Sequence, residues 1–95
     1  APDIIKIDTE GFDYQVLLGA LGTIGRARPY VVVEKNTDLL KDFERYFKAL
    51  YYRIFTYDYT RDLFTAFDPA SADAGGASNN LFCIPQEKVS VLPVR

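Results

Sequence analysis

Histidine is absent from this 95-residue sequence, and cysteine occurs once, at Cys83. Histidine and cysteine are the commonest ligands of transition metals, so a transition-metal site is not expected. A single thiol cannot form an internal disulfide, and Cys83 lies in an apolar run, where we expect it to be buried and inert. No apolar run approaches the roughly 20 residues of a membrane-spanning helix, and no signal peptide is visible. These absences favour a cytoplasmic protein without a membrane span.

The net charge is small, and methionine is absent. The net charge of −2 provides no broad basic surface, so binding of nucleic acid through its phosphates is not expected. Hydrophobic residues make up 48% of the chain, including seven Phe and seven Tyr, which is enough for a packed core. The length allows at most one small domain. Because the sequence has no methionine and a strand-like run begins just after Ala1, we expect a fragment of a longer protein.

Two strand-and-helix units open the chain. Residues 4–7 form an apolar run that predicts a short parallel strand, buried on both faces. Apolar side chains then recur at helical spacing, at Val16, Leu17, Ala20, Leu21 and Ile24. Glycines interrupt this stretch at Gly19, Gly22 and Gly25, which predicts a break or an early end of the helix.

The second unit begins with residues 30–34, a valine-rich run that predicts a strand ending in polar groups. Thr37 or Asp38 is the expected N-cap of the helix that follows. The apolar stripe of this helix consists of Leu39, Leu40, Phe43, Phe47 and Leu50.

The remainder of the sequence predicts mainly short strands. They are expected at residues 52–59, 63–67 and 80–85, with a flexible loop at 68–79 and no clear period after 85. Two strand-and-helix units imply a parallel core, while the closing strands are too near one another for a helical crossover and should pair antiparallel. The predicted fold class is therefore α/β with a mixed sheet that is parallel at its core and has an antiparallel terminal strand.

Acidic and polar residues follow the first two strands. Asp8 and Glu10 come directly after the first strand, and Glu34 and Asn36 lie at the end of the second. Ligands of open α/β sheets bind just beyond the carboxyl ends of the strands, so these four side chains are the candidate site. Two other roles stay open: Asp8 and Glu10 can order the turn by bonding backbone N–H groups, and Glu34 can cap the loop after it. Lys6 is either a buried partner of these acids or a surface lysine.

The segment around Asp8 resembles the hallmark of the FkbM-type methyltransferases, "IKIDVEG-x-E-x-x-VLxGA". The matching positions are Ile5, Lys6, Ile7, Asp8, Glu10, Gly11, Val16, Leu17, Gly19 and Ala20. The resemblance continues through Pro29 and the strand that ends in Glu34, and through the final segment at residues 80–85. One departure is Asn36, which stands where the family often has histidine.

The resemblance implies an S-adenosylmethionine-dependent methyltransferase with a Rossmann-like sheet of seven strands in the order 3-2-1-4-5-7-6. Residues 1–95 would supply strands four to seven, the C-terminal half of that domain. The Gly-rich cofactor loop and the ribose-binding acid would lie outside the chain, so no cofactor-binding residue is named and the isolated chain is expected to be inactive. The acceptor would be a hydroxyl on a sugar, lipid or polyketide-like molecule.

By the same resemblance, Asp8 would be the catalytic base or acceptor-positioning group, with Glu10 second, and Glu34 and Asn36 would contact the substrate. Two other functions stay open. The chain can be a non-enzymatic α/β module that binds a protein through an open sheet edge, or an α/β enzyme, such as a phosphohydrolase, with an acidic Mg²⁺ turn. Self-association through residues 3–8 is also expected, because that strand would lack a neighbour.

Overall fold

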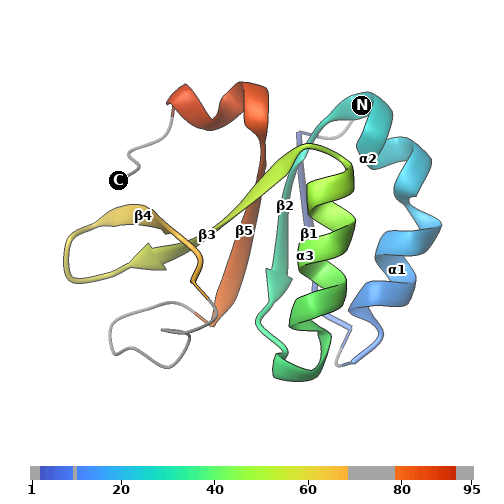
Figure 1. The fold of residues 1–95 in the computed structure, drawn as a ribbon, viewed down its shortest axis with the longest axis horizontal. Coiled ribbons are helices and arrows are strands. Elements are labelled where there is room, and N and C mark those ends of the chain that lie inside the picture. The colour runs from blue at the N-terminus through green and yellow to red at the C-terminus, as the bar shows by residue number, and fades with distance from the viewer. Residues whose placement is uncertain (1–2, 10, 69–78, 92–95) are drawn as a thin grey trace.

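The computed structural model describes residues 3–9, 11–68 and 79–91, which form three helices and a five-stranded sheet (Figure 1). The first part of the chain contains β1 (Ile4–Ile7), α1 (Asp13–Gly19), α2 (Leu21–Ala27), β2 (Tyr30–Glu34), the 3₁₀ turn η1 (Thr37–Leu39) and α3 (Leu40–Ala49). The second part contains β3 (Tyr52–Asp58), β4 (Leu63–Ala66), β5 (Asn80–Pro85) and the 3₁₀ helix η3 (Gln86–Val91).

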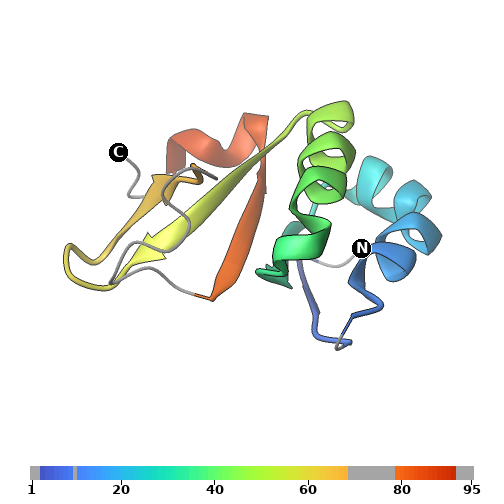
Figure 2. The ribbon, with the colours of Figure 1, turned by 60° about the horizontal axis from the view of Figure 1, so that its bottom comes forward.

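The sheet has the strand order β1-β2-β5-β3-β4. Strands β1 and β2 run parallel, whereas β5 is antiparallel to both β2 and β3, and β3 is antiparallel to β4. The prediction of an α/β fold with a mixed sheet and antiparallel closing strands is thus confirmed. Helices α1, α2 and α3 gather at one side of the molecule, and the β3–β4 hairpin extends at the other (Figures 1 and 2).

One face of the sheet carries the hydrophobic core. Alternate residues of the strands point to this face, among them Val31 and Val33 of β2 and Leu81 and Cys83 of β5, all fully buried. They pack against the helices, which contribute Leu17, Ile24, Phe43, Tyr46 and Phe47. Cys83 is buried as predicted, and its burial raises the pKa of its thiol. The core therefore joins the three helices to one side of the sheet.

Two tyrosine hydroxyls tie the core to the backbone. Tyr46 of α3 donates a hydrogen bond to the carbonyl oxygen of Leu17 in α1 at 2.6 Å. Tyr52 of β3 donates to the carbonyl oxygen of Pro29 at 2.6 Å, and burial raises the pKa of Tyr52 to about 12. Each bond satisfies a polar group inside an apolar environment and fixes one helix or loop to its neighbour.

The first strand has the predicted bounds but not the predicted burial. Strand β1 lies at the edge of the sheet, where β2 is its only neighbour among the described strands. Ile4 is 65% exposed and Lys6 is exposed, whereas Ile7 is buried against the helices. The expectation of a strand buried on both faces is wrong because no described element covers the face that carries Ile4 and Lys6. The exposure of Lys6 also excludes its role as a buried partner of the acids.

The helix boundaries follow the sequence in part. Helix α1 ends at Gly19 and α2 begins at Leu21, so the predicted break is confirmed. The expected N-cap, Thr37 or Asp38, is wrong: Asn36 caps η1, and its side-chain oxygen accepts a hydrogen bond from the backbone N–H of Asp38 at 3.0 Å. The 3₁₀ helix η3 was not predicted. Most of the expected loop, residues 69–78, lies outside the described residues. No helix within the described ranges is long and apolar enough to cross a membrane.

Arg28 fastens η3 to the rest of the fold. It is the C-cap of α2 and has a left-handed backbone, with φ of 54°. Its Nε and Nη2 donate to the two carboxylate oxygens of Glu87 in η3, each at 2.9 Å, and other donors reach the carbonyl oxygens of Leu50 and Tyr51. The guanidinium also lies 4.8 Å from the ring centroid of Tyr52. One side chain thus joins α2, the α3–β3 turn and η3.

The Arg28–Glu87 pair predicts how stability depends on pH. The hydrogen bonds from Arg28 lower the pKa of Glu87 from 4.5 to about 2. The pair therefore stabilises the fold fully above about pH 4.5, and this contribution is lost as the pH falls from 4.5 towards 2. We expect Glu87→Gln to lower stability by about 1 kcal/mol at pH 7, a value discounted because the Glu87 side chain is half exposed.

Thermal unfolding followed by circular dichroism at pH 7, 4 and 2.5 measures this effect. The gap in Tm between the wild-type chain and Glu87→Gln should narrow as the pH falls. Glu44→Gln, which removes an exposed acid of α3, is the matched control and should change Tm little at pH 7. A gap that stays the same at all three pH values would contradict the assignment.

Candidate functional site

The chain turns sharply after β1. Strand β1 ends at Ile7, Asp8 and Thr9 follow, and α1 begins at Asp13. Gly11 adopts a φ of 108°, a conformation that residues with a Cβ rarely reach, although a Cβ there would meet no atom within 4 Å. The glycine is therefore required by the backbone of the turn and not by crowding.

The ends of β1 and β2 lie side by side. The two strands are parallel, and Ile7 of β1 is in register with Val33 of β2. Asp8 and Glu34 are the next residues in each strand direction, so they meet at the same edge of the sheet. This is the carboxyl end of a parallel pair, where α/β folds bind their ligands.

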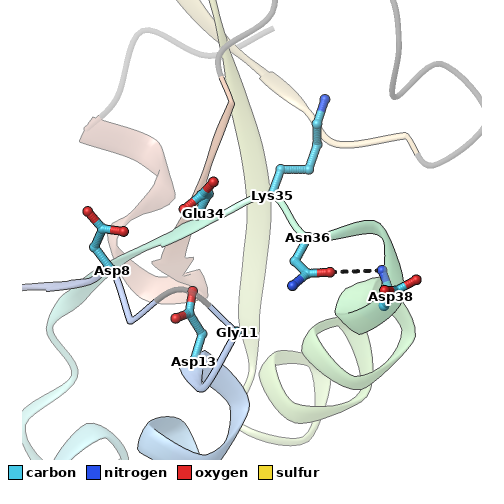
Figure 3. A pocket seen from close by; sticks show the side chains of 7 residues that line it. All are labelled: Asp8, Gly11, Asp13, Glu34, Lys35, Asn36 and Asp38. Atoms are coloured by element: carbon cyan, nitrogen blue, oxygen red, sulfur yellow. Dashed lines mark hydrogen bonds between the residues drawn. The ribbon is translucent and has the colours of Figure 1, made fainter.

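A cavity of about 530 Å³ opens at this edge. It is lined by Asp8, Gly11, Asp13, Glu34, Lys35, Asn36 and Asp38. Figure 3 shows that Asp8, just after β1, Asp13 of α1 and Glu34 of β2 border one space, while the Lys35 side chain extends away from them. We refer to this cavity as the acidic pocket.

Most of the residues predicted from the sequence meet in the acidic pocket. Asp8 and Glu34 line it and are exposed, and Asn36 lines it while its side-chain oxygen also caps η1. Glu10 lies outside the described residues, so its position stays a prediction. Within the described ranges, the Asp8 carboxylate has no hydrogen-bond or ion-pair partner, so the contact that orders the turn comes from another residue.

That residue is Asp13, which sequence reasoning missed. Asp13 is only 3% exposed, and its Oδ1 accepts hydrogen bonds from the backbone N–H of Thr9, at 3.0 Å, and from the Thr9 hydroxyl. It also lines the acidic pocket. A signal was present, because Asp13 stands where the methyltransferase pattern has Glu, two residues beyond Gly11.

The lining gives the acidic pocket an excess of negative charge. Four carboxylates, those of Asp8, Asp13, Glu34 and Asp38, belong to the described lining, whereas its one cationic side chain, Lys35, extends away from Asp8, Asp13 and Glu34. Carboxylate oxygens accept hydrogen bonds from hydroxyl and ammonium groups and repel anions. Within the described ranges, no group of three or more His, Cys, Asp or Glu side chains is arranged to hold a metal ion. The pocket is thus built to accept hydrogen bonds and protons.

A comparison with protein-family models matches residues 1–59 to a model described as the methyltransferase FkbM domain. The matched segment covers more than half of the chain and contains every residue that lines the acidic pocket. No curated protein and no solved structure matches the chain.

Proposed function

The chain belongs to the FkbM methyltransferase domain family, and from this premise we propose that it takes part in S-adenosylmethionine-dependent methylation of a hydroxyl group. The observation that carries the proposal is the acidic pocket, because residues of the family match lie together at the carboxyl ends of β1 and β2. Such a position suits an acceptor whose hydroxyl must be aligned and deprotonated.

The sheet order supports this proposal. In the Rossmann-like order 3-2-1-4-5-7-6, the last four strands follow one another as 4-5-7-6, and the seventh is antiparallel to its neighbours. Strands β1, β2, β5 and β3 are arranged in the same way, with β5 antiparallel to β2 and β3. Strand β4 is an addition that forms a hairpin with β3.

The described residues do not form a cradle for the cofactor. Of their glycines, only Gly11 follows a strand, whereas Gly19 lies in α1 and Gly22 and Gly25 lie in α2. A Gly-rich turn after a strand, which would hold the amino-acid part of S-adenosylmethionine, is therefore not found in the described part of the chain. The cofactor supplies an electrophilic methyl group when bound, and the residues described here supply the acceptor side.

Asp8 is the residue best suited to handle the acceptor proton. Its carboxylate is exposed to the acidic pocket, so it can accept the proton of a hydroxyl group as that oxygen attacks. Glu34, on the neighbouring strand, can accept a hydrogen bond from an adjacent hydroxyl and orient the acceptor, and Asn36 can do the same. Glu10, two residues beyond Asp8, is the second candidate for the base.

The negative charge of the acidic pocket disfavours anionic methyl acceptors. An anionic acceptor, such as a phosphorylated sugar or a uronic acid, would meet the carboxylates of the described lining, whose one cationic side chain, Lys35, extends away from Asp8, Asp13 and Glu34. A neutral molecule with several hydroxyl groups would instead find several hydrogen-bond acceptors. Neutral sugars and neutral polyketide-like or lipid hydroxyls therefore fit the site better than anionic acceptors.

We expect Asp8→Asn to reduce methyl transfer by roughly 10²–10⁴-fold in the protein that carries this domain, the usual scale for a general base. The substitution keeps the size of the side chain and removes its charge, so binding of the cofactor should change much less. Transfer of tritium from methyl-labelled S-adenosylmethionine to a panel of neutral sugars, amino sugars and uronic acids measures the rate. Glu44→Gln, outside the acidic pocket, is the control. An unchanged rate in a folded Asp8→Asn variant would show that Asp8 does not take the acceptor proton.

We also expect the 95-residue chain to bind S-adenosylmethionine weakly or not at all, because the described residues contain no Gly-rich turn after a strand. Calorimetric titration of the folded chain with the cofactor measures this, and the near-ultraviolet circular dichroism spectrum verifies the fold. A dissociation constant in the micromolar range would contradict the prediction and would mean that the chain forms its own cradle.

A second candidate function is a non-enzymatic module that binds another chain through its sheet edge. The observation that favours it is the position of β1 at the edge of the described sheet. The carbonyl oxygen of Asp3 accepts a hydrogen bond from the backbone N–H of Tyr30 in β2. The backbone N–H and C=O groups of the odd-numbered residues of β1 therefore point towards β2. The backbone groups of Ile4 and Lys6 therefore point to the open side, where they can pair with another strand.

This edge predicts self-association of the isolated chain. Multi-angle light scattering should detect a dimer or a larger species, and Ile4→Lys should return it to a monomer, because charged side chains on an edge strand oppose pairing. Leu18→Lys, which places the same charge on an exposed position of α1, is the matched control and should leave the association unchanged. A strictly monomeric wild-type chain at high concentration would contradict the prediction.

A further inference from the structure

We propose that Asp13 is the positioning residue of the acidic pocket and that it holds Asp8 in place through Thr9. The inference rests on the proposed function of the pocket, and it adds a residue that acts through another group without touching the acceptor hydroxyl. Three observations carry it: the hydrogen bonds of Asp13, its burial, and the packing of the helix on which it stands.

The hydrogen bonds of Asp13 fix the backbone next to Asp8. Both donors of Thr9, its backbone N–H and its hydroxyl, end on Oδ1 of Asp13. The N–H belongs to the peptide group that links Asp8 to Thr9, so holding it sets the orientation of that peptide plane. The direction in which the Asp8 side chain leaves the backbone depends on this plane. Asp13 therefore controls Asp8 without contacting it.

The contrast in burial separates the two roles. Asp13 is 3% exposed, whereas Asp8 is exposed to the acidic pocket. A buried carboxylate is unfavourable unless it is hydrogen-bonded, and the two donors of Thr9 provide that compensation. Asp13 is thus committed to the turn, and Asp8 stays available for a ligand.

Asp13 is itself held by the core. Leu17 stands four residues further along α1, on the same helix face, and is fully buried. The carbonyl oxygen of Leu17 accepts the hydrogen bond from Tyr46 of α3 at 2.6 Å. The packed helices therefore fix the position of Asp13, and Asp13 fixes the turn. This gives the exposed Asp8 a defined geometry before any ligand binds.

Asp13→Ala in the full chain tests this inference. Alanine removes the acceptor, and its high helix propensity limits the cost of losing the acid in the first turn of α1. ¹⁵N relaxation should show the order parameter of the Thr9 amide falling from about 0.85 to below about 0.6. Its hydrogen exchange should become roughly tenfold faster or more, as expected for loss of a hydrogen bond to a charged group.

Two further variants define the effect. Asp38→Ala removes a carboxylate from the same pocket but leaves the bond between Asp13 and the Thr9 amide, so this amide should stay ordered. The cap of η1 also remains, because the backbone N–H of Asp38 makes that bond. Asp13→Asn, which keeps a side-chain oxygen, should restore part of the order. A role confined to stabilising α1 would instead loosen the amides of that helix as a group. An unchanged Thr9 amide in folded Asp13→Ala would overturn the proposal.

If Asp13→Ala does not fold, Asp13→Asn provides the second measurement, because it keeps a side-chain oxygen but removes the charge that strengthens the hydrogen bond from the Thr9 amide. Faster exchange at the Thr9 amide in this variant supports the proposal, and an unchanged rate overturns it. The methyl-transfer assay on the sugar panel then tests the link to Asp8: the double variant Asp8→Asn/Asp13→Asn should be no slower than Asp8→Asn alone. Absence of methylation by the wild-type protein would refute the proposed function and leave the relaxation result standing.

Discussion

The parallel pairing of β1 with β2 is the constraint on which the candidate site depends. With Ile7 in register with Val33, the two strands end together, and Asp8 and Glu34 meet at one edge of the sheet. An antiparallel arrangement would place these two acids at opposite ends of the pair. A slip of one residue would turn the side chains of β1 to the other face, moving Ile7 out of the core. The buried isoleucine thus fixes the register, and the register creates the acidic pocket.

The two ends of the parallel β1–β2 pair differ in how many of the polar side chains there form hydrogen bonds or ion pairs. At the end opposite the acidic pocket, Arg28 bonds Glu87 and two carbonyl oxygens, and Lys88 donates to the carbonyl oxygen of Arg28. These contacts join three segments of the chain and contribute to stability. At the pocket end, Asp8 and Glu34 are exposed. The Arg28–Glu87 ion pair is therefore at the opposite end of the sheet from the exposed acids that can bind a ligand.

The sequence predicts strands well where a β-branched or apolar run is bounded by polar or turn residues. The bounds of β1, β2 and β5 agree with the predicted ranges, and the glycine-rich stretch after Val16 breaks where expected. Burial is harder to predict, because the composition of β1 does not reveal which elements cover it. Ile4 is apolar and yet 65% exposed. The helix η3 escaped prediction because a 3₁₀ helix of six residues is too short to display a period.

The sequence also predicts the candidate site only in part. Asp8, Glu34 and Asn36 follow strands, and that placement was enough to bring them to the acidic pocket. Asp13 was missed because it follows the turn as the first residue of α1, and its importance lies in a contact with Thr9 that depends on the path of the chain through Gly11. Asn36 was expected at the substrate, yet its side chain also caps η1, a local interaction that asparagine commonly makes.

Asp8 follows the edge strand β1 and also lines the acidic pocket. Ile4, Lys6 and Asp8 alternate along the chain with residues that face the core, so their side chains leave β1 and its end on the same side. A strand that pairs with the open edge of β1 and extends past Ile7 would lie next to Asp8. Pairing at this edge would exclude water from the acid and strengthen its electrostatic interactions, since charges act more strongly in a less polar environment. The proposed enzymatic and binding functions would thus be physically coupled, because an occupant of the sheet edge would set the environment of the proposed base.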